Sequence, residues 1–274
     1  MRLGAPIQPF DSPETWVRML QNAGFRAAYC PVSTGADSAT VQAYRMAALA
    51  NDIVIAEVGV WNNPLSVDST SRHQAIAQCQ QSLALADEIG ARCCVNIAGS
   101  RGDVWDGPHP DNFSADTFDL IVETVRHIID AVKPGRTFYT LEPMPWVFPD
   151  SPDSYLDLIR AIDRPQFGVH FDPVNMISGP RRYFDNAAFM DECFSKLGRF
   201  MKSCHAKDIT LHSKLTVHLD EVRPGLGSLN YPTLLRGINR LDDVPVMLEH
   251  LPSEDYPAAA AFVRSIAHAL TISL

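Results

Sequence analysis

The run RTFYTLEP, residues 136–143, is a short stretch of β-branched and aromatic residues that ends at a carboxylate, Glu142. Such a composition is typical of a buried strand. Three later runs have the same form, and each ends near a side chain that can bind a metal ion: QFGVHFDP (166–173) with Asp172, RFMKSCHAKD (199–208) with His205, and VPVMLEHL (244–251) with Glu249.

The spacing of these four residues indicates a repeating unit. They follow one another at separations of 30, 33 and 44 residues. One strand and its crossover helix should take about 34 residues if a chain of this length closes into an eightfold barrel. A long loop over residues 212–229 accounts for the larger last step.

The same alternation extends toward the N-terminus. Strands are predicted at MRLGAPI (1–7), AAYCPV (27–32), DIVIAEVGVW (52–61) and CCVNIAG (93–99). A helix should begin at Ser12-Pro13-Glu14, and Ser38 is expected to cap the next one. The remaining amphipathic segments are predicted as helices over residues 38–50, 71–89, 115–132, 153–162, 187–197, 231–241 and 257–270.

Eight strand–helix alternations predict parallel strands joined by helical crossovers. We therefore expect an α/β fold, a (β/α)₈ TIM barrel, as a single domain over residues 1–274. A doubly wound open sheet is the competing fold, but no Gly-rich phosphate-binding turn follows the first strand.

Composition excludes several classes of partner. The net charge is −9 and the pI is about 5.4, so neither nucleic acid nor a membrane surface is expected to bind. No apolar run has the length of a spanning helix, and the first residues lack a secretory signal. Six cysteines without a CxxC pair favour a reducing environment, and we expect a cytoplasmic protein.

Neighbouring strand ends meet at the C-terminal face of such a barrel, so Glu142, Asp172, His205 and Glu249 should converge on one divalent metal ion. Any one of them alone is more often a helix cap or a core histidine, but four on successive units point to a site. The oxygen-rich set favours Mn²⁺, with Mg²⁺ or Co²⁺ as alternatives.

The two-residue period of a strand supports this assignment. If Glu142 faces the barrel axis, then Thr140 does too, and the apolar Tyr139 and Leu141 face the helices. By the same argument His170 shares the inward face with Asp172. Cys204 faces outward beside His205, so it is a packing residue and not a further ligand.

These motifs resemble the xylose-isomerase-like barrel superfamily of sugar isomerases and epimerases. The resemblance covers nearly the whole chain and depends on LEPMPW, HFDPVN, HAKD, PGLG and LEHL. It implies the four metal ligands named above, with Glu142 and Glu249 also acting as the acid/base pair. Asn175 and Leu211 depart from the His and Arg that ketose epimerases of the group carry, and His170 or Lys207 is the candidate replacement donor.

The hypothesis for the reaction is proton transfer through an enediolate. A sugar or polyol-like substrate would bind the metal through its carbonyl and an adjacent hydroxyl. Glu142 or Glu249 would then remove the proton next to the carbonyl and return it at the neighbouring carbon or on the opposite face. The product would be an isomer or an epimer.

Further substrate contacts are predicted near the mouth of the barrel. The candidates for binding the sugar are His170, Asn175, Lys207, Trp61, Trp146, Asn96 and Arg101, with Trp105, Glu57 and the loop arginines Arg181 and Arg182 as weaker ones. His218, Glu221 and Arg223 lie in the long loop after the seventh strand, which is expected to cover the site.

The same four predicted metal ligands are compatible with other functions. The resemblance includes polyol dehydratases and C-glycoside deglycosidases, the latter with a small partner chain, and a non-catalytic sugar-binding barrel is a further alternative. The endonuclease IV branch is disfavoured because the first four strands lack histidines at their ends. We expect a homo-oligomer that acts on a small carbohydrate.

Overall fold

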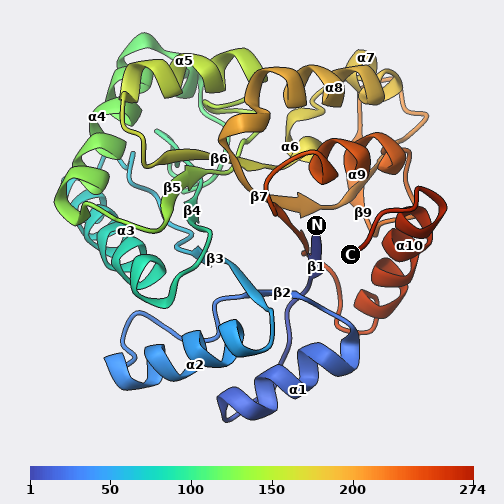
Figure 1. The fold of residues 1–274 in the computed structure, drawn as a ribbon. Helices are drawn as coiled ribbons and strands as arrows, with labels where there is room; N and C mark the ends of the chain where they lie inside the picture. The colour runs from blue at the N-terminus through green and yellow to red at the C-terminus, as the bar shows by residue number, and fades with distance from the viewer.

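The computed structural model describes residues 1–274 and is a closed eight-stranded barrel surrounded by helices (Figure 1). Its strands are all parallel, in the cyclic order β1-β10-β7-β6-β5-β4-β3-β2. The barrel strands are β1 (Arg2–Gly4), β2 (Ala27–Tyr29), β3 (Val54–Gly59), β4 (Cys93–Asn96), β5 (Phe138–Leu141), β6 (Phe167–Phe171), β7 (Met201–Ala206) and β10 (Pro245–Leu248). The predicted (β/α)₈ fold is confirmed.

Helices cover the outside of the barrel between successive strands (Figure 1). The long ones are α1 (Pro13–Ala23), α2 (Ser38–Ala50), α3 (Ser69–Ile89), α4 (Ala115–Val132), α5 (Pro152–Ile162), α8 (Asn186–Leu197), α9 (Tyr231–Asn239) and α10 (Tyr256–Ala269). Ser12 caps α1 as predicted, because its side chain accepts a hydrogen bond from the Thr15 amide. The Ser38 cap is wrong: Asp37 caps α2 through the Thr40 amide, and Ser38 is already helical.

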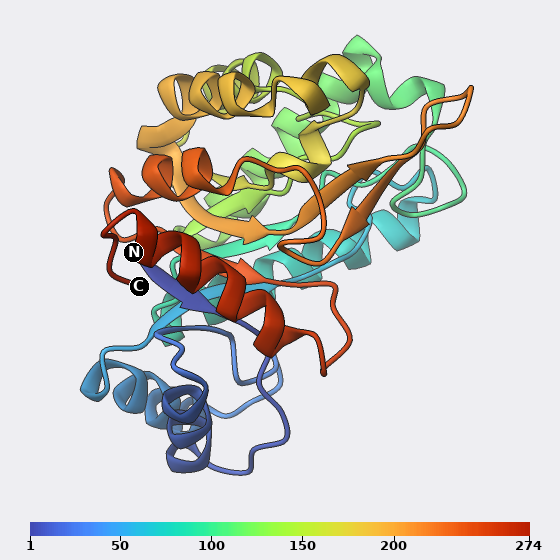
Figure 2. The same ribbon diagram turned by 90° about the vertical axis from the view of Figure 1, so that its right-hand side faces the viewer.

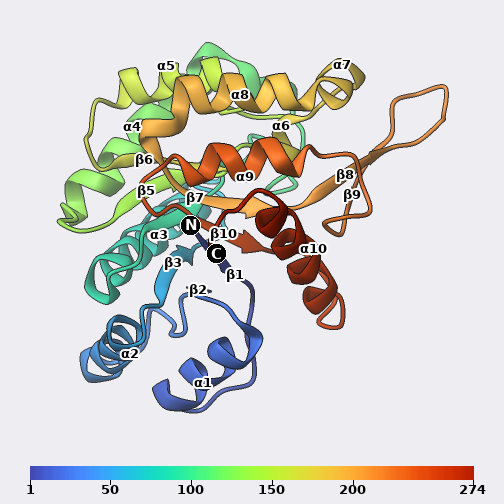
Figure 3. The same cartoon turned by 45° about the vertical axis from the view of Figure 1, so that its right-hand side comes forward.

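Several shorter elements lie in the loops at the C-terminal ends of the strands. They are η1 (Pro110–Phe113), α6 (Pro173–Met176), α7 (Pro180–Phe184), and a hairpin of β8 (Asp208–Leu211) and β9 (Leu219–Val222). One further short helix, η2 (Gly198–Phe200), lies between α8 and the N-terminal end of β7. The hairpin is antiparallel and projects away from the barrel (Figures 2 and 3). The segment expected to be a plain loop over residues 212–229 therefore contains a strand.

The main core lies between the barrel and its helices, as alternation along the strands predicts. Tyr139, Leu141, Val169, Phe171 and Cys204 all belong to it, together with helix residues from every side. Small side chains such as Ala27 and Ala56 pack with Met247 in a separate cluster. Gly4 is required on β1, because a Cβ there would lie 2.4 Å from the Ala27 carbonyl oxygen.

The helices of this fold are all too short or too polar to cross a membrane.

Candidate metal centre

Four strands on one side of the barrel bring the four predicted ligands together. Glu142, Asp172 and Glu249 directly follow β5, β6 and β10, and His205 is the fifth residue of β7. All four side chains are buried. Since β5, β6, β7 and β10 are consecutive in the barrel, their C-terminal ends meet at one point.

The donor atoms of these residues form a compact group. His205 Nδ1 lies 2.8 Å from Glu249 Oε1 and 3.2 Å from Glu142 Oε1. Asp172 Oδ2 is 3.9 Å from the same nitrogen. One donor atom from each residue can be chosen so that all lie within 4.8 Å of one another, which is a separation that a single ion can bridge.

The residues present fit a divalent metal ion on two observations. Asp172 Oδ2 and Glu249 Oε1 are buried and accept no hydrogen bond of good geometry, so each has a lone pair free to bind a cation. The donor set of three carboxylates and one imidazole matches the preference of Mn²⁺ and Mg²⁺ for hard ligands.

Lys207 is the one ammonium group at this centre, and it is only 2% exposed. Its Nζ lies 2.8 Å from Glu249 Oε1 and 2.9 Å from Asp172 Oδ2. These ion-pair contacts offset part of the negative charge of the three carboxylates. Nζ also donates to Asn175 Oδ1 at 3.3 Å.

Asn175 links two of the acidic ligands. Its side-chain nitrogen donates to Glu142 Oε1 at 3.0 Å, and its backbone amide donates to Asp172 Oδ1 at 3.1 Å. Asp172 thereby caps the short helix α6. Asn175 therefore holds one oxygen of Glu142 and one oxygen of Asp172 in place.

A second buried layer lies against the other side of His205. Glu57 Oε1 lies 3.0 Å from His205 Nε2, and Glu57 Oε2 accepts a hydrogen bond from Ser203 at 2.8 Å. The rings of His170 and His205 meet edge to face at 4.0 Å. His170 is completely buried and neither of its nitrogens has a hydrogen-bond partner.

Burial and mutual charge shift the pKa values of this group in different directions. Burial raises the pKa of Glu142 to about 7, against the opposing effect of His205. Burial also opposes protonation of His205, but the carboxylates of Glu249, Glu57 and Glu142 outweigh it and raise its pKa well above the usual value. For His170, burial and the neighbouring His205 lower the pKa to about 4.

The other members of the cluster are charged. The pKa of Lys207 is raised well above its usual value, because the surrounding carboxylates outweigh the effect of burial. The pKa of Glu249 is lowered, since attraction to His205 and Lys207 outweighs its desolvation. Without a metal ion the centre therefore holds a proton on His205 and an ammonium on Lys207.

Sequence analysis missed two residues that fix the strand ends. The Tyr155 hydroxyl on α5 lies 2.6 Å from the Leu141 carbonyl and 3.3 Å from the His170 amide, so it joins β5 and β6 beside Glu142 and Asp172. The Asp208 carboxylate accepts backbone hydrogen bonds from residues 225, 227 and 229. The signal for Asp208 was present, because HAKD and PGLG were both recognised as motifs.

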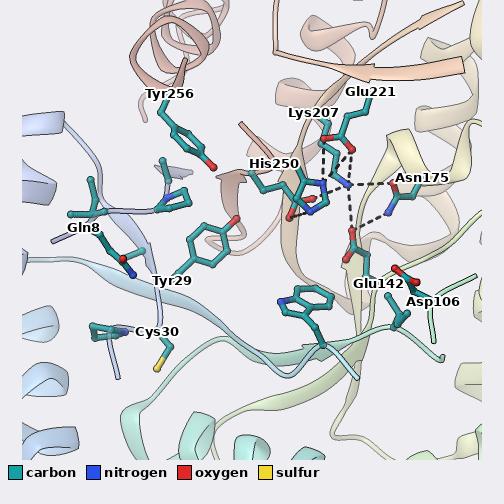
Figure 4. A pocket seen from close by; sticks show the side chains of 18 of the residues that line it. Gln8, Tyr29, Cys30, Asp106, Glu142, Asn175, Lys207, Glu221, His250 and Tyr256 are labelled. Carbon is teal, nitrogen blue, oxygen red and sulfur yellow. Dashed lines mark hydrogen bonds and ion pairs between the residues drawn. The ribbon is translucent and has the colours of Figure 1, made fainter. Parts of the chain in front are cut away.

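A cavity of about 550 Å³ opens above the centre (Figure 4). Among the ligands, Glu142 and Glu249 line it, whereas Asp172 and His205 do not. The residues predicted to bind substrate that line it are Asn175, Lys207 and Trp61, together with Trp105 and Glu221. Trp61 lies over His205, at 6.5 Å between ring centroids.

The remaining predicted contacts lie elsewhere. His170 is in the barrel interior below the ligands, and Asn96 hydrogen-bonds Asn62 at 2.8 Å. Trp146 donates to the Asp106 carbonyl at 2.6 Å, and Arg101 donates to the Leu65 carbonyl at 2.6 Å. The cavity is lined by no arginine, so the predicted contacts Arg181, Arg182 and Arg223 lie outside it, and His218 does not line it either.

Comparison with known families and structures agrees with this architecture. A family model described as "xylose isomerase-like TIM barrel" matches residues 11–266. Comparison with curated protein sequences gives no match.

Solved structures share the fold over nearly the full chain. A xylose isomerase-like TIM barrel protein from Mycobacterium smegmatis in complex with magnesium has a TM-score of 0.67 and 16% identity, and the match covers 95% of this chain and 90% of that one. The probable 3-DHS dehydratase of petrobactin synthesis from Bacillus anthracis has a TM-score of 0.68, 16% identity and 99% coverage of both chains. For 3-keto-D-glucoside 4-epimerase from E. coli the TM-score is 0.66, with 13% identity and coverage of 97% and 99%.

Proposed function

We propose that this chain, which belongs to the xylose isomerase-like TIM barrel family, is a divalent-metal-dependent isomerase or epimerase of a keto sugar. The observation that carries the proposal is the convergence of Glu142, Asp172, His205 and Glu249, with two buried carboxylate oxygens that accept no hydrogen bond. Three hard carboxylates favour Mn²⁺, with Mg²⁺ or Co²⁺ as alternatives.

A divalent ion held by these four residues would polarise the carbonyl of a bound sugar and stabilise the negative charge of an enediolate. Proton transfer itself belongs to the chain. Glu142 and Glu249 are the two ligands whose side chains line the cavity, so they can reach a carbon of a substrate bound there. We assign them as the groups that remove and return the proton.

Three further side chains have supporting roles in this proposal. Lys207 and Asn175 line the cavity beside Glu142 and can hydrogen-bond the reacting oxygens of the sugar. Asn175 takes the place of the histidine expected in ketose epimerases, and its amide already orients Glu142. Trp61 can stack on a sugar face and exclude water from His205.

A lyase reaction is the second candidate. A polyol dehydratase or a C-glycoside deglycosidase would also begin by proton removal next to a carbonyl, and one structural neighbour is a probable dehydratase. A non-catalytic sugar-binding barrel would use the same cavity.

We further propose that the protein works in the cytoplasm as a homo-oligomer. It would act on a small carbohydrate and bind neither nucleic acid nor a membrane.

Solvent deuterium incorporation tests the reaction. The Mn²⁺-loaded protein is incubated in D₂O with ketoses, inososes and 3-keto glycosides, and proton NMR follows each carbon. We expect exchange at one carbon that EDTA abolishes and that Glu142→Gln or Glu249→Gln slows by about a hundredfold or more. Glu123→Gln, an exposed change on α4, is the control. Unchanged exchange in both active-site variants would refute the assignment.

Loss of a substrate hydroxyl as water, or appearance of a free aglycone, would favour a lyase reaction over isomerisation. Tight sugar binding without proton exchange at any carbon would favour a non-catalytic sugar-binding protein.

A further inference from the structure

The cavity above the metal centre has two chemically different sides (Figure 4). Most side chains that carry charge or amide groups come from the strands of the ligand half and from their loops, and the two others are Gln8 and Asp106. Those of the ligand half are Glu142, Asn175, Lys207, Glu221, Glu249 and His250. Figure 4 shows Gln8, Tyr29 and Cys30 across the cavity from Lys207 and Asn175.

The opposite side is built from the loop after β1, from α1 and from the end of β2. Its lining includes Ala5, Pro6, Ile7, Phe10, Trp16, Ala28 and Pro31. We call these seven residues the apolar wall. It lies across the barrel from Glu142, Asp172, His205 and Glu249, which come from β5, β6, β7 and β10 and their ends.

Polar groups beside the apolar wall are already engaged. The Tyr29 hydroxyl donates to the Leu248 carbonyl at 3.1 Å, and Cys30 Sγ lies 3.3 Å from the Val32 carbonyl. The exceptions are Gln8 and the Tyr256 hydroxyl, which accepts a hydrogen bond from the Leu251 amide but can still donate one. A sugar carries hydroxyls on most of its carbons, and beside this wall most of them would lose their water partners without gaining others. A second sugar ring is therefore a poor occupant, and an apolar group is a good one.

Charge also limits what can bind. No arginine lines the cavity, and its one lysine is held by carboxylates of the centre. His250 lies 3.3 Å from Glu221, so that imidazole is paired as well. Asp106 adds another carboxylate to the lining. Away from the proposed metal site, a phosphate or carboxylate on the ligand would meet no unpaired cationic side chain, so a neutral ligand is favoured.

The geometry points to a neutral glycoside as the ligand, whose sugar ring binds at the carboxylate side and whose aglycone is an aromatic, apolar group against the apolar wall. Phe10, Tyr29 and Trp61 supply aromatic surface for such a group, and Trp16, which is only 1% exposed, supports the wall from behind. This inference rests on the proposed sugar chemistry for the ring, whereas the aglycone site stands on the apolar wall itself.

A matched pair of ligands tests the aglycone site. Methyl and phenyl 3-keto-β-D-glucosides are titrated into the Mn²⁺-loaded protein by isothermal calorimetry. Burial of a phenyl ring should tighten binding of the phenyl compound by about ten- to a hundredfold over the methyl compound. Equal affinities, or no detectable binding of the phenyl compound, would overturn the inference.

Ile7→Ser makes the apolar wall more polar at a half-buried loop position. It should reduce the advantage of phenyl over methyl by roughly three- to tenfold while the methyl affinity stays constant. Ile76→Ser, at a half-buried site on α3 away from the cavity, is the matched control and should leave the ratio unchanged. A thermal melt establishes that both variants are folded. An unchanged ratio in folded Ile7→Ser would count against this site.

Fructose and fructose 6-phosphate test the charge argument in the same assay. We expect the phosphate to bind no more tightly than the free sugar, and tighter binding would overturn the neutral-ligand part.

The two proposals fail separately. Proton exchange in a free ketose with no phenyl advantage would remove the aglycone site and leave the sugar reaction standing. Tighter binding of the phenyl compound without proton exchange in any compound would leave the aglycone site standing and remove the sugar reaction.

Discussion

His205 connects the metal centre to the interior of the barrel. Its Nδ1 faces Glu249 and Glu142, while its Nε2 lies 3.0 Å from Glu57. A neutral imidazole carries one N–H, so a hydrogen bond from Nε2 to Glu57 leaves the lone pair of Nδ1 free for a cation. Ser203 holds the other oxygen of Glu57. Glu57 is therefore a positioning residue that acts through His205.

We predict that Glu57→Gln weakens Mn²⁺ binding by about ten- to a hundredfold, because the amide no longer enforces this tautomer. Calorimetric titration of the metal measures the effect without any substrate. Glu123→Gln on the exposed face of α4 is the matched control and should bind Mn²⁺ like the unmodified protein. An unaltered metal affinity in Glu57→Gln would mean that the contact with His205 is only structural.

Metal affinity should rise with pH. The pKa of His205 is raised well above its usual value and that of Glu142 is raised to about 7, so the metal-free site holds protons at neutral pH. A cation must displace them, and removing them beforehand by raising the pH favours the cation. We expect affinity to increase roughly tenfold per pH unit for each proton released. Titrations between about pH 6 and 8 measure the slope, and a flat profile would contradict these protonation states.

Among individual residues, the sequence identified the four side chains that the structure brings together, but not the residues that contact them. Glu142, Asp172, His205 and Glu249 could be recognised because each stands at the end of a strand run. The contact between Glu57 and His205 joins residues 148 positions apart in the chain, and no local pattern encodes it. Arg101 and Trp146 were predicted near the sugar from their loop positions, but their side chains bond to backbone carbonyls there.

Among the loop elements, the segment after β7 is organised by one buried carboxylate. Asp208 begins β8 and accepts hydrogen bonds from the amides of Gly225 and Gly227 at 3.0 Å and of Leu229 at 2.9 Å. Gly227 is required for this approach, because a Cβ there would lie 2.3 Å from Asp208 Oδ1. The HAKD and PGLG motifs are therefore two parts of one structure that places Lys207 and the β8–β9 hairpin.

We predict that Asp208→Asn destabilises the protein by roughly 1–3 kcal/mol, because the amide group accepts on one oxygen only and leaves buried backbone amides unsatisfied. Thermal unfolding should show a midpoint several degrees lower, about 2–4 °C per kcal/mol for a chain of this size. Asp220→Asn on the exposed hairpin is the control. If both variants melt alike, Asp208 does not organise the loop.

Helix positions were predictable wherever caps and periodicity agreed. The helix over residues 115–132 has the predicted bounds, with Ser114 as its cap. The short helices α6 and α7 were not predicted, because four or five residues are too few to show a period. The β8–β9 hairpin was missed because its strands have four residues each and their exposed connection resembles a loop.

Across the whole molecule, the ligands occupy one half of the barrel and the apolar wall occupies the other. This division follows from the order of the strands, since β5, β6, β7 and β10 are neighbours and β1 to β4 complete the ring. Eight alternations were enough to predict the barrel. The oligomeric state stays a prediction, and light scattering measures it.

Titration of the metal-free protein with Mn²⁺, followed by the paramagnetic resonance signal of the free ion, tests the central claim most directly. We predict one bound ion per chain, and a loss of affinity of more than about a hundredfold in Asp172→Asn and in His205→Asn. His268→Asn, exposed on α10, should bind normally. Absence of binding, or equal affinity in the two ligand variants, would contradict a metal centre at Glu142, Asp172, His205 and Glu249.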